Sequence, residues 1–300
     1  MAELSYMQAS SSIVTQHLEE AIRESLESLP PMPAVITRVM EMTNDPNCGV
    51  QELQKVISMD EVLSSKVLRL VNSARYGFPR RITTLSHAVI LLGFETIRNL
   101  AIGVAAVRLL LRQGASSPIN RQRFWEHSLE TGLAASAFAK HLRKDLITRE
   151  EMFLTGLLHD LGILFLSQNF PTEYRAVIER CGSIEAASPV EQELLGITHT
   201  EVGARMVEYW NLPPVFAEVM RHHHNPIEDS PFFHQVGAVY LGDRVSQSIA
   251  AEEPAEQMPE LPASLCEVFQ LDGNSWSWCR REVEMQMDAA RDFLHILQSP

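Results

Sequence analysis

The chain has 300 residues, of which 45% are hydrophobic, and its formal net charge is −13. This length leaves room for two or three packed units with a real core, and the negative charge argues against broad electrostatic binding to nucleic acid or to an anionic membrane. The four cysteines are scattered and form no C-x-x-C pair, which favours reduced thiols in the cytoplasm over a disulfide framework.

The N-terminal sequence MAELSYMQASSS has no basic region followed by an apolar core, so it does not resemble a signal peptide. After it, Leu18, Ile22 and Leu26 recur at four-residue steps, which predicts a helix with one apolar stripe. The prolines of LPPMPAV then exclude a helix interior. The chain therefore opens on one separate helix, which we place within residues 1–25.

The next segments also have helical periodicity. Shorter helices are predicted in AVITRVMEMTNDPN, VQELQKVISMD and EVLSSKVLRLVNSARYG, and a longer pair in ITTLSHAVILLGFETIRNLAIGVAAVRLLL, with Gly93 as the expected break. The longest apolar stretch, around Leu100–Val107, is too short to span a bilayer and is followed by Arg108. We expect no membrane-spanning segment and a first helical subdomain at 26–115.

A polar stretch, QGASSPIN, predicts a linker from Gln113 to Asn120. Helical patterns resume in FWEHSLETGLAASAFAKHL, EEMFLTGLLHDLGILFLS and PTEYRAVIERC, and continue through about His199–Trp210, PVFAEVMRHHH and FFHQVGAVYLGDRVSQSIA. A second polar break, AEEPAEQMPELPAS, precedes a C-terminal helix around Arg281–Leu297. Because strand signals are nearly absent, the sequence predicts an all-α protein of two packed helical subdomains, the second at 116–250, with a helical extension at 251–300.

The run GLLHDLG places His159 and Asp160 among large apolar residues. A buried carboxylate is costly unless it is paired or bound to a metal. Imidazole and carboxylate from one helical turn suit a divalent ion such as Fe, Mn, Ni or Zn. Taken alone, the pair is explained equally well by a buried hydrogen bond or a helix cap.

Further ligand-type residues recur at apolar helix faces: His127, His199, His223, His224 and Asp243. Each one alone is more often structural or solvent-facing. Separate helices that each offer a His or an Asp are typical of a metal site built in the core of a bundle. Adjacent helical residues point about 100° apart, so the run of three histidines is not a three-pronged chelator, and His222 is expected to be a bystander.

In this order, H…HD…H…HH…D resembles the HD-domain superfamily of metal-dependent phosphohydrolases. LPPMPAVITRVMEMTNDP, VISMDEVLSSKVLRLVNSARYG and ITTLSHAVILLGFETIRNLAIG are similar to the opening of its HDOD branch, the HD-related output domain of bacterial signalling proteins. The similarity runs from about Leu26 to Ala250. It implies an HD-like second bundle with metal ligands at His127, His159, Asp160, His199, His223, His224 and Asp243. HHHNPIED lacks the Gly-Tyr-Pro of the branch that cleaves cyclic di-GMP, so that activity is not predicted.

Three functions stay open. The first is a bacterial signal-transduction module that binds a signalling protein or a small nucleotide-like ligand and holds one or two divalent ions, among Fe, Mn, Ni, Mg and Zn. The second is a phosphohydrolase acting on a nucleotide or cyclic nucleotide, with Asp160 as a catalytic residue. The third is a metal-free polar network that stabilises the fold. The C-terminal helix is expected either to mediate self-association or to pack back on the HD-like half.

The most basic part of this acidic chain surrounds NSARYG and contains Lys66, Arg69, Arg75, Arg80 and Arg81. Side chains of this kind bind phosphate or nucleotide groups. Charge runs are more often simply solvated. Both interpretations remain open from the sequence.

Overall fold

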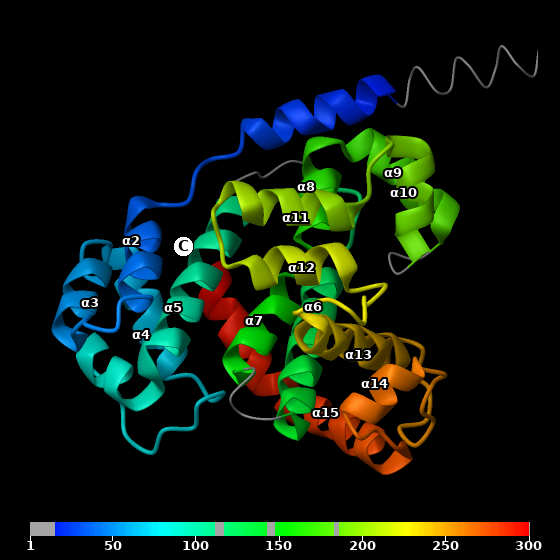
Figure 1. Cartoon of the computed structure of the whole chain (residues 1–300). Coiled ribbons are helices and arrows are strands. Elements are labelled where there is room, and N and C mark those ends of the chain that lie inside the picture. The colour runs from blue at the N-terminus through cyan, green and yellow to red at the C-terminus, as the bar shows by residue number, and fades with distance from the viewer. Residues whose placement is uncertain (1–15, 112–116, 143–147, 183–185, 300) are drawn as a thin grey trace, which may run out of the picture.

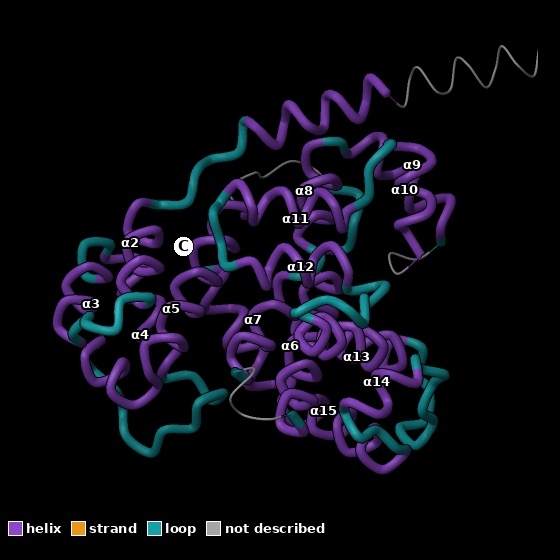
Figure 2. The backbone as a smooth tube through the Cα atoms, viewed as in Figure 1, coloured by secondary structure: helices purple, strands orange, loops and turns teal. Residues whose placement is uncertain are grey.

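The computed structural model describes residues 16–111, 117–142, 148–182 and 186–299, and these residues contain helices and loops but no strand (Figures 1 and 2). The all-α prediction is confirmed. The first helix covers residues 16–27. It is followed by α2 (Ala34–Thr43), α3 (Val50–Ile57), α4 (Glu61–Val71), α5 (Leu85–Leu111), α6 (Arg121–Phe138), the 3-10 helix η1 (Ala139–His141), α7 (Arg149–Leu158), α8 (Leu161–Asn169), α9 (Pro171–Cys181), α10 (Ala187–Leu195), α11 (His199–Tyr209), α12 (Pro214–His222), α13 (Phe233–Ala250), α14 (Ala263–Val268) and α15 (Gly273–Gln298).

Helices α2 to α5 form the first subdomain, at the left of Figure 1. Local hydrogen bonds cap its short helices. The Asp60 carboxylate, for example, accepts a hydrogen bond from the Leu63 amide at the start of α4. Helix α5 is interrupted at Gly93, whose φ of 83° and ψ of 166° are not helical. The predicted break is therefore confirmed.

By length and composition, Leu85–Leu110 is the one segment of the described residues that could cross a membrane, although 56% of its most apolar window is buried inside the protein. The helices that cover it are other parts of the same chain, because α2, α3, α4, α7 and α15 all pack against α5. A core helix passes the same test of length and composition.

Helix α6 is the centre of the second subdomain. Every residue from His127 to Ala139 is buried, because α7, α13 and α15 pack around it. The polar side chains of a helix that is buried on all sides cannot reach solvent. The polar residues of α6 must therefore find partners inside the protein.

The first and last described helices connect the two subdomains. Helix 16–27 runs along the second subdomain (Figure 1), where Leu26 shares a groove with Tyr209 of α11. The Trp210 indole donates a hydrogen bond to the Pro30 carbonyl at 3.0 Å. Helix α15 packs against α6 in the second subdomain and against α4 and α5 in the first. It begins at Gly273, eight residues before the predicted start at Arg281, because the Asp272 carboxylate caps it earlier.

Replacing Gly93 with alanine tests the backbone at the break in α5. The φ and ψ of Gly93 lie in a region essentially reserved for glycine, and no atom beyond its chain neighbours lies within 4 Å of the Cβ that alanine would add. We therefore expect Gly93→Ala to lower the free energy of unfolding by about 1–3 kcal/mol through backbone strain alone.

Gly273→Ala is the matched control, because the space around Gly273 is equally open and its φ is not positive. Alanine there should be neutral or slightly stabilising, since it is the better helix former. Urea unfolding followed by circular dichroism measures both variants. Equal losses in the two would contradict the backbone explanation.

Candidate metal centre

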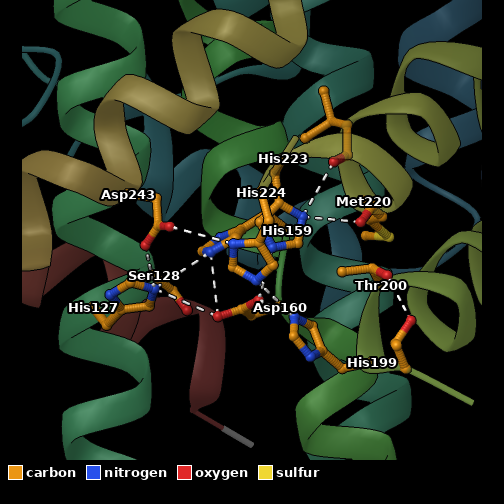
Figure 3. A network of polar contacts seen from close by, with 12 residues as sticks. His127, Ser128, His159, Asp160, His199, Thr200, Met220, His223, His224 and Asp243 are labelled. Atoms are coloured by element: carbon orange, nitrogen blue, oxygen red, sulfur yellow. Dashed lines mark hydrogen bonds and ion pairs between the residues drawn. The ribbon is translucent and has the colours of Figure 1, made fainter. Parts of the chain in front are cut away.

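The structure gathers all seven predicted ligand residues in the core of the second subdomain (Figure 3). They form two adjoining groups, and within each group one ligand atom per residue lies within 4.8 Å of the others. The first group comprises Asp160, His199, His223 and His224, and the second comprises His127, His159 and Asp243. Five segments, distant in sequence, supply them: α6, the α7–α8 junction, α11, the end of α12 and α13.

The His159–Asp160 pair differs from the expectation of a single helical turn. Helix α7 ends at Leu158 and α8 begins at Leu161, so the pair occupies the junction between two helices. Asp160 has φ of −100° and ψ of 17°, outside the helical region. The break frees the two side chains from the angular spacing of a helix, and His159 Nε2 lies 3.2 Å from Asp160 Oδ2.

A helix end also explains how two neighbouring histidines reach one centre. Helix α12 ends at His222. His223 and His224 follow in a turn, where their ring centroids lie 4.0 Å apart. His222 lies on the helix and belongs to neither ligand group.

Backbone carbonyls fix the orientation of two of the imidazoles. His159 Nδ1 donates to the Gly156 carbonyl at 2.7 Å, and His223 Nδ1 donates to the Met220 carbonyl at 2.9 Å. A carbonyl only accepts hydrogen bonds, so each Nδ1 carries the proton. In the neutral ring, Nε2 is then a bare lone pair directed at the centre, as in metal-bound histidines.

A buried carboxylate fixes His199. Glu191 Oε2 accepts hydrogen bonds from both the backbone N–H and Nδ1 of His199, each at 2.7 Å. The Tyr174 hydroxyl donates to the other oxygen of Glu191 at 2.8 Å. Burial, reinforced by the Glu191 charge, raises the pKa of Tyr174 well above its usual range, so this hydroxyl keeps its proton.

His127 is oriented by a relay of side chains. The Ser246 hydroxyl donates to Glu130 Oε2 at 2.6 Å. Its oxygen therefore accepts from His127 Nδ1, which lies 2.9 Å away. His127 Nε2 faces inward, 3.3 Å from His159 Nε2.

At the centre, hydrogen-bond acceptors face one another. Neutral His127 and His159 would direct two lone pairs at each other, and His223 Nε2 lies 3.3 Å from Asp160 Oδ1. These last two atoms are buried and lack a hydrogen-bond partner in the described structure. Facing acceptors are unfavourable unless a positive charge lies between them. A divalent cation fits this donor set, since imidazole nitrogens and carboxylate oxygens are the ligands that transition ions prefer.

The close packing of these ionisable groups shifts the pKa values of several of them. Burial raises the pKa of Asp160, but the imidazoles of His159, His127 and His223, whenever they carry a second proton that can face the carboxylate, outweigh burial and hold the pKa of this carboxyl well below its usual range. Burial lowers the pKa of His199, but the Glu191 carboxylate raises it to about 9. Burial, with the charges of His223 and His199, lowers the pKa of His224 to about 2.

Four carboxylates are buried in or beside the centre: Asp160, Asp243, Glu130 and Glu191 are 0–5% exposed. Among the described residues, Arg123 is the one Lys or Arg within ion-pair distance of any of them, 3.6 Å from Glu130. Buried charge is stable only when it is compensated. Arg123 compensates Glu130, and if the five imidazoles are neutral, one or two divalent ions would compensate the remaining three carboxylates.

The centre is nearly closed. Of the seven side chains only His224 is substantially exposed, at 29%, and the other six residues are at most 7% exposed. Any molecule that reaches the centre in this conformation must approach past His224.

Sequence reasoning did not identify the residues that support the ligands: Glu130, Glu191, Ser246 and Tyr174. Glu130 had a usable signal, because it lies three positions after His127 on the same helix and shares its face. Glu191 had none, since PVEQELL reads as an ordinary amphipathic turn.

The predicted phosphate-binding residues separate into two sets. Lys66 is 4% exposed and donates to the Leu297 carbonyl at 3.0 Å. The side chain of Arg75 is 8% exposed, pairs with Glu150 at 3.3 Å, and lies 3.5 Å above the Phe153 ring. These two cations have interior partners. Arg69, Arg80 and Arg81 are exposed.

Comparisons with known proteins show which family and which proteins this chain is similar to. The model of the HDOD domain matches residues 29–226. An uncharacterized protein of Treponema pallidum (strain Nichols) is 27% identical over 254 residues, which are 82% of this chain and 47% of that protein. The chain thus spans about half the length of the curated relative it matches.

Two solved structures share the fold. A "putative phosphohydrolase" of Shewanella amazonensis SB2B has a TM-score of 0.72 at 22% identity and covers 92% of this chain and 98% of its own. A "putative signal transduction protein" of Marinobacter aquaeolei VT8 has a TM-score of 0.76 at 22% identity, covering 97% of this chain and 66% of its own. The predicted fold, two helical subdomains of which the second is HD-like, is confirmed.

Replacing Glu191 with alanine tests the support of His199. The change leaves three buried donors without an acceptor: two N–H groups of His199 and the hydroxyl of Tyr174. We expect Glu191→Ala to lower the free energy of unfolding by about 3 kcal/mol or more, measured by urea unfolding in EDTA.

Glu193→Ala is the control on the same helix. Glu193 pairs with Arg180 at the surface, where the two side chains are 59% and 51% exposed. Such pairs contribute little, and we expect a change within about 0.5 kcal/mol. A loss for Glu191→Ala no larger than that of Glu193→Ala would show that His199 does not depend on this carboxylate.

Proposed function

Because the chain belongs to the HDOD family, we propose that it is a signal-transduction module whose HD-like half holds a pair of divalent metal ions. The observation that carries the proposal is the convergence of acceptor atoms on one centre. The Nδ1 atoms of His127, His159, His199 and His223 are each committed to a protein partner, which leaves each Nε2 for the centre.

The two ligand groups suggest how two ions would share the centre. His199, His223 and His224 would hold one ion, and His127, His159 and Asp243 the other. Asp160 would contribute to both, because its Oδ1 lies 3.3 Å from His223 Nε2 and its Oδ2 lies 3.4 Å from His127 Nε2. Five imidazoles favour Fe, Mn, Ni or Zn over Mg, which prefers oxygen ligands.

A regulatory role fits the closure of the centre. Ligands from five segments would make occupancy by metal a condition for the packing of α6, α7, α11, α12 and α13 against one another. A partner protein or small ligand would then distinguish the packed form of these helices from the unpacked form. The name of the Marinobacter structure, a "putative signal transduction protein", agrees with this role.

The matched pair His223→Ala and His222→Ala tests the proposal. The two residues are adjacent, and only His223 belongs to a ligand group. Wild type and His222→Ala should carry about two metal ions per chain and His223→Ala clearly less, measured by plasma mass spectrometry on protein purified under reducing, metal-supplemented conditions. EDTA should lower the melting temperature of wild type and of His222→Ala. A site with free metal at about 100 times its Kd contributes about 2.7 kcal/mol to the free energy of unfolding, and EDTA removes this contribution.

A metal-free wild type under these conditions would contradict the proposal and favour the purely structural polar network. Equal metal content in the two variants would also contradict it. Circular dichroism of His223→Ala distinguishes loss of the ligand from loss of the fold.

A phosphohydrolase is the second candidate, favoured by the exposed edge of His224 and by the complete set of ligands. A bound divalent ion would polarise a phosphoryl oxygen and activate water. Asp160, which faces both ligand groups, would orient the reacting groups, and a substrate would enter past His224. The "putative phosphohydrolase" of Shewanella amazonensis has the same fold.

Turnover separates the two candidates. The metal-loaded protein is screened against nucleotides and phosphodiesters, with Asp160→Asn as the inactive variant. Hydrolysis that is lost in Asp160→Asn favours the enzyme. Full metal content without hydrolysis favours the regulatory module.

A further inference from the structure

A groove with a volume of about 950 Å³ lies between α4, the loop that follows it and the C-terminal end of α15. Its size is at the upper end of the range for small-molecule sites. None of its lining residues belongs to the candidate metal centre. The groove is therefore a separate feature, formed mainly by the first subdomain.

The groove is basic in an acidic protein. Arg69 and Arg81 line it, and His295 adds an imidazole. Among the described residues, neither Arg69 nor Arg81 has a carboxylate within ion-pair distance, although the chain carries 38 acidic residues. Two unpaired guanidinium groups on one concave surface are suited to bind an anion, and phosphate above all. Asp292 is the one acidic residue of the lining.

One wall of the groove is rigid before any ligand binds. The Asn72 side chain donates to the Leu68 carbonyl at 2.7 Å and to the Ile82 carbonyl at 2.8 Å. It also accepts from the Ile82 amide at 2.7 Å. These bonds fasten the loop to the end of α4 and so fix the backbone that carries Arg81. A fixed wall loses less entropy when a ligand binds.

An aromatic ring completes the lining. Phe78 is half-buried in the groove and stacks on Tyr76, with a centroid distance of 6.4 Å and an interplanar angle of 7°. The Tyr76 hydroxyl donates to Glu150 of α7 at 3.0 Å, which holds the stack in place. A planar ring can stack on such a surface while the arginines bind an attached phosphate.

We propose that this groove binds a nucleotide, with the phosphate on Arg69 and Arg81 and the base against Phe78. The site is distinct from the metal centre, and its existence does not depend on the function proposed for that centre. It accounts for two of the exposed arginines and for the polar hollow at the end of α15.

The probe for the test is adenosine monophosphate, with inorganic phosphate and adenosine as its two halves. Binding is measured by isothermal titration calorimetry at low ionic strength on the full chain. The wild type should bind the mononucleotide more tightly than either half. Arg69→Gln and Arg81→Gln should each weaken its binding about tenfold, as expected for a lost hydrogen bond to a charged group. Phe78→Leu should weaken binding of the mononucleotide and leave that of phosphate unchanged.

Two control variants test the sign of the charge effect and the location of the bound phosphate. Asp292→Asn should strengthen binding of the mononucleotide, because it removes a negative charge from the groove. Arg80→Gln should leave affinity unchanged within about twofold, since Arg80 is exposed nearby but does not line the groove. Circular dichroism confirms that each variant is folded, and Arg81→Gln is the cleaner of the arginine variants because Arg69 also donates to Ser299.

The proposal is overturned if the wild type binds none of the probes, or if Arg80→Gln weakens binding as much as Arg81→Gln. Phosphate that binds as tightly as the mononucleotide overturns the assignment of a nucleotide. Asp160→Asn and EDTA-treated wild type should both retain binding. Binding that is lost in both would place the ligand at the metal centre and overturn the proposal, whereas failure of the metal-binding proposal would leave this groove unaffected.

Discussion

The burial of carboxylates among apolar helices is the constraint on which the second subdomain depends. A carboxylate in such a place is stable only if positive charge or several hydrogen-bond donors surround it. Histidines from three other segments, His127, His199 and His223, face Asp160 at 3.3–3.5 Å, and together they form a donor set that a cation would hold together. The helices must therefore approach closely. At Gly162, just after Asp160, an added Cβ would lie 2.0 Å from the His199 carbonyl oxygen, so α8 and α11 pack backbone against backbone.

Helix α7 connects this centre to the rest of the protein. Its last turn leads into His159 and Asp160. Near its first turn, Glu150 binds Arg75 and Tyr76 from the loop that borders the groove. Arg75 is also enclosed by Phe153 and Phe293, so α15 contributes to the same junction. One short helix is thus held by the first subdomain at one end and leads into the candidate metal centre at the other.

The fold and the seven candidate ligands could be predicted because their signals are local or repeated along the chain. Helical periodicity gives the elements, and His or Asp in an apolar run is conspicuous. The resemblance to the HDOD family added the grouping of His127, His159, His199 and the others into one set. Of the supporting residues, Glu191 and Ser246 could not be predicted, because they acquire their roles only when α10 packs near α11 and α13 packs on α6. The burial of Lys66 and Arg75 could not be predicted for the same reason, because their hydrogen-bond partners are 231 and 75 residues away in the sequence.

The packing of the first and last described helices on the second subdomain has a consequence for how the protein folds. Helix 16–27 lies on α11, and α15, the last helix, packs on α6. The contacts that complete this half thus join segments separated by more than a hundred residues, and closing such loops is slow. During synthesis, α6 stays partly uncovered until α15 has left the ribosome, well after all seven ligand residues have been made. We therefore expect the helical scaffold to close only after α15 has left the ribosome, which leaves an interval in which chaperones can bind the incomplete core.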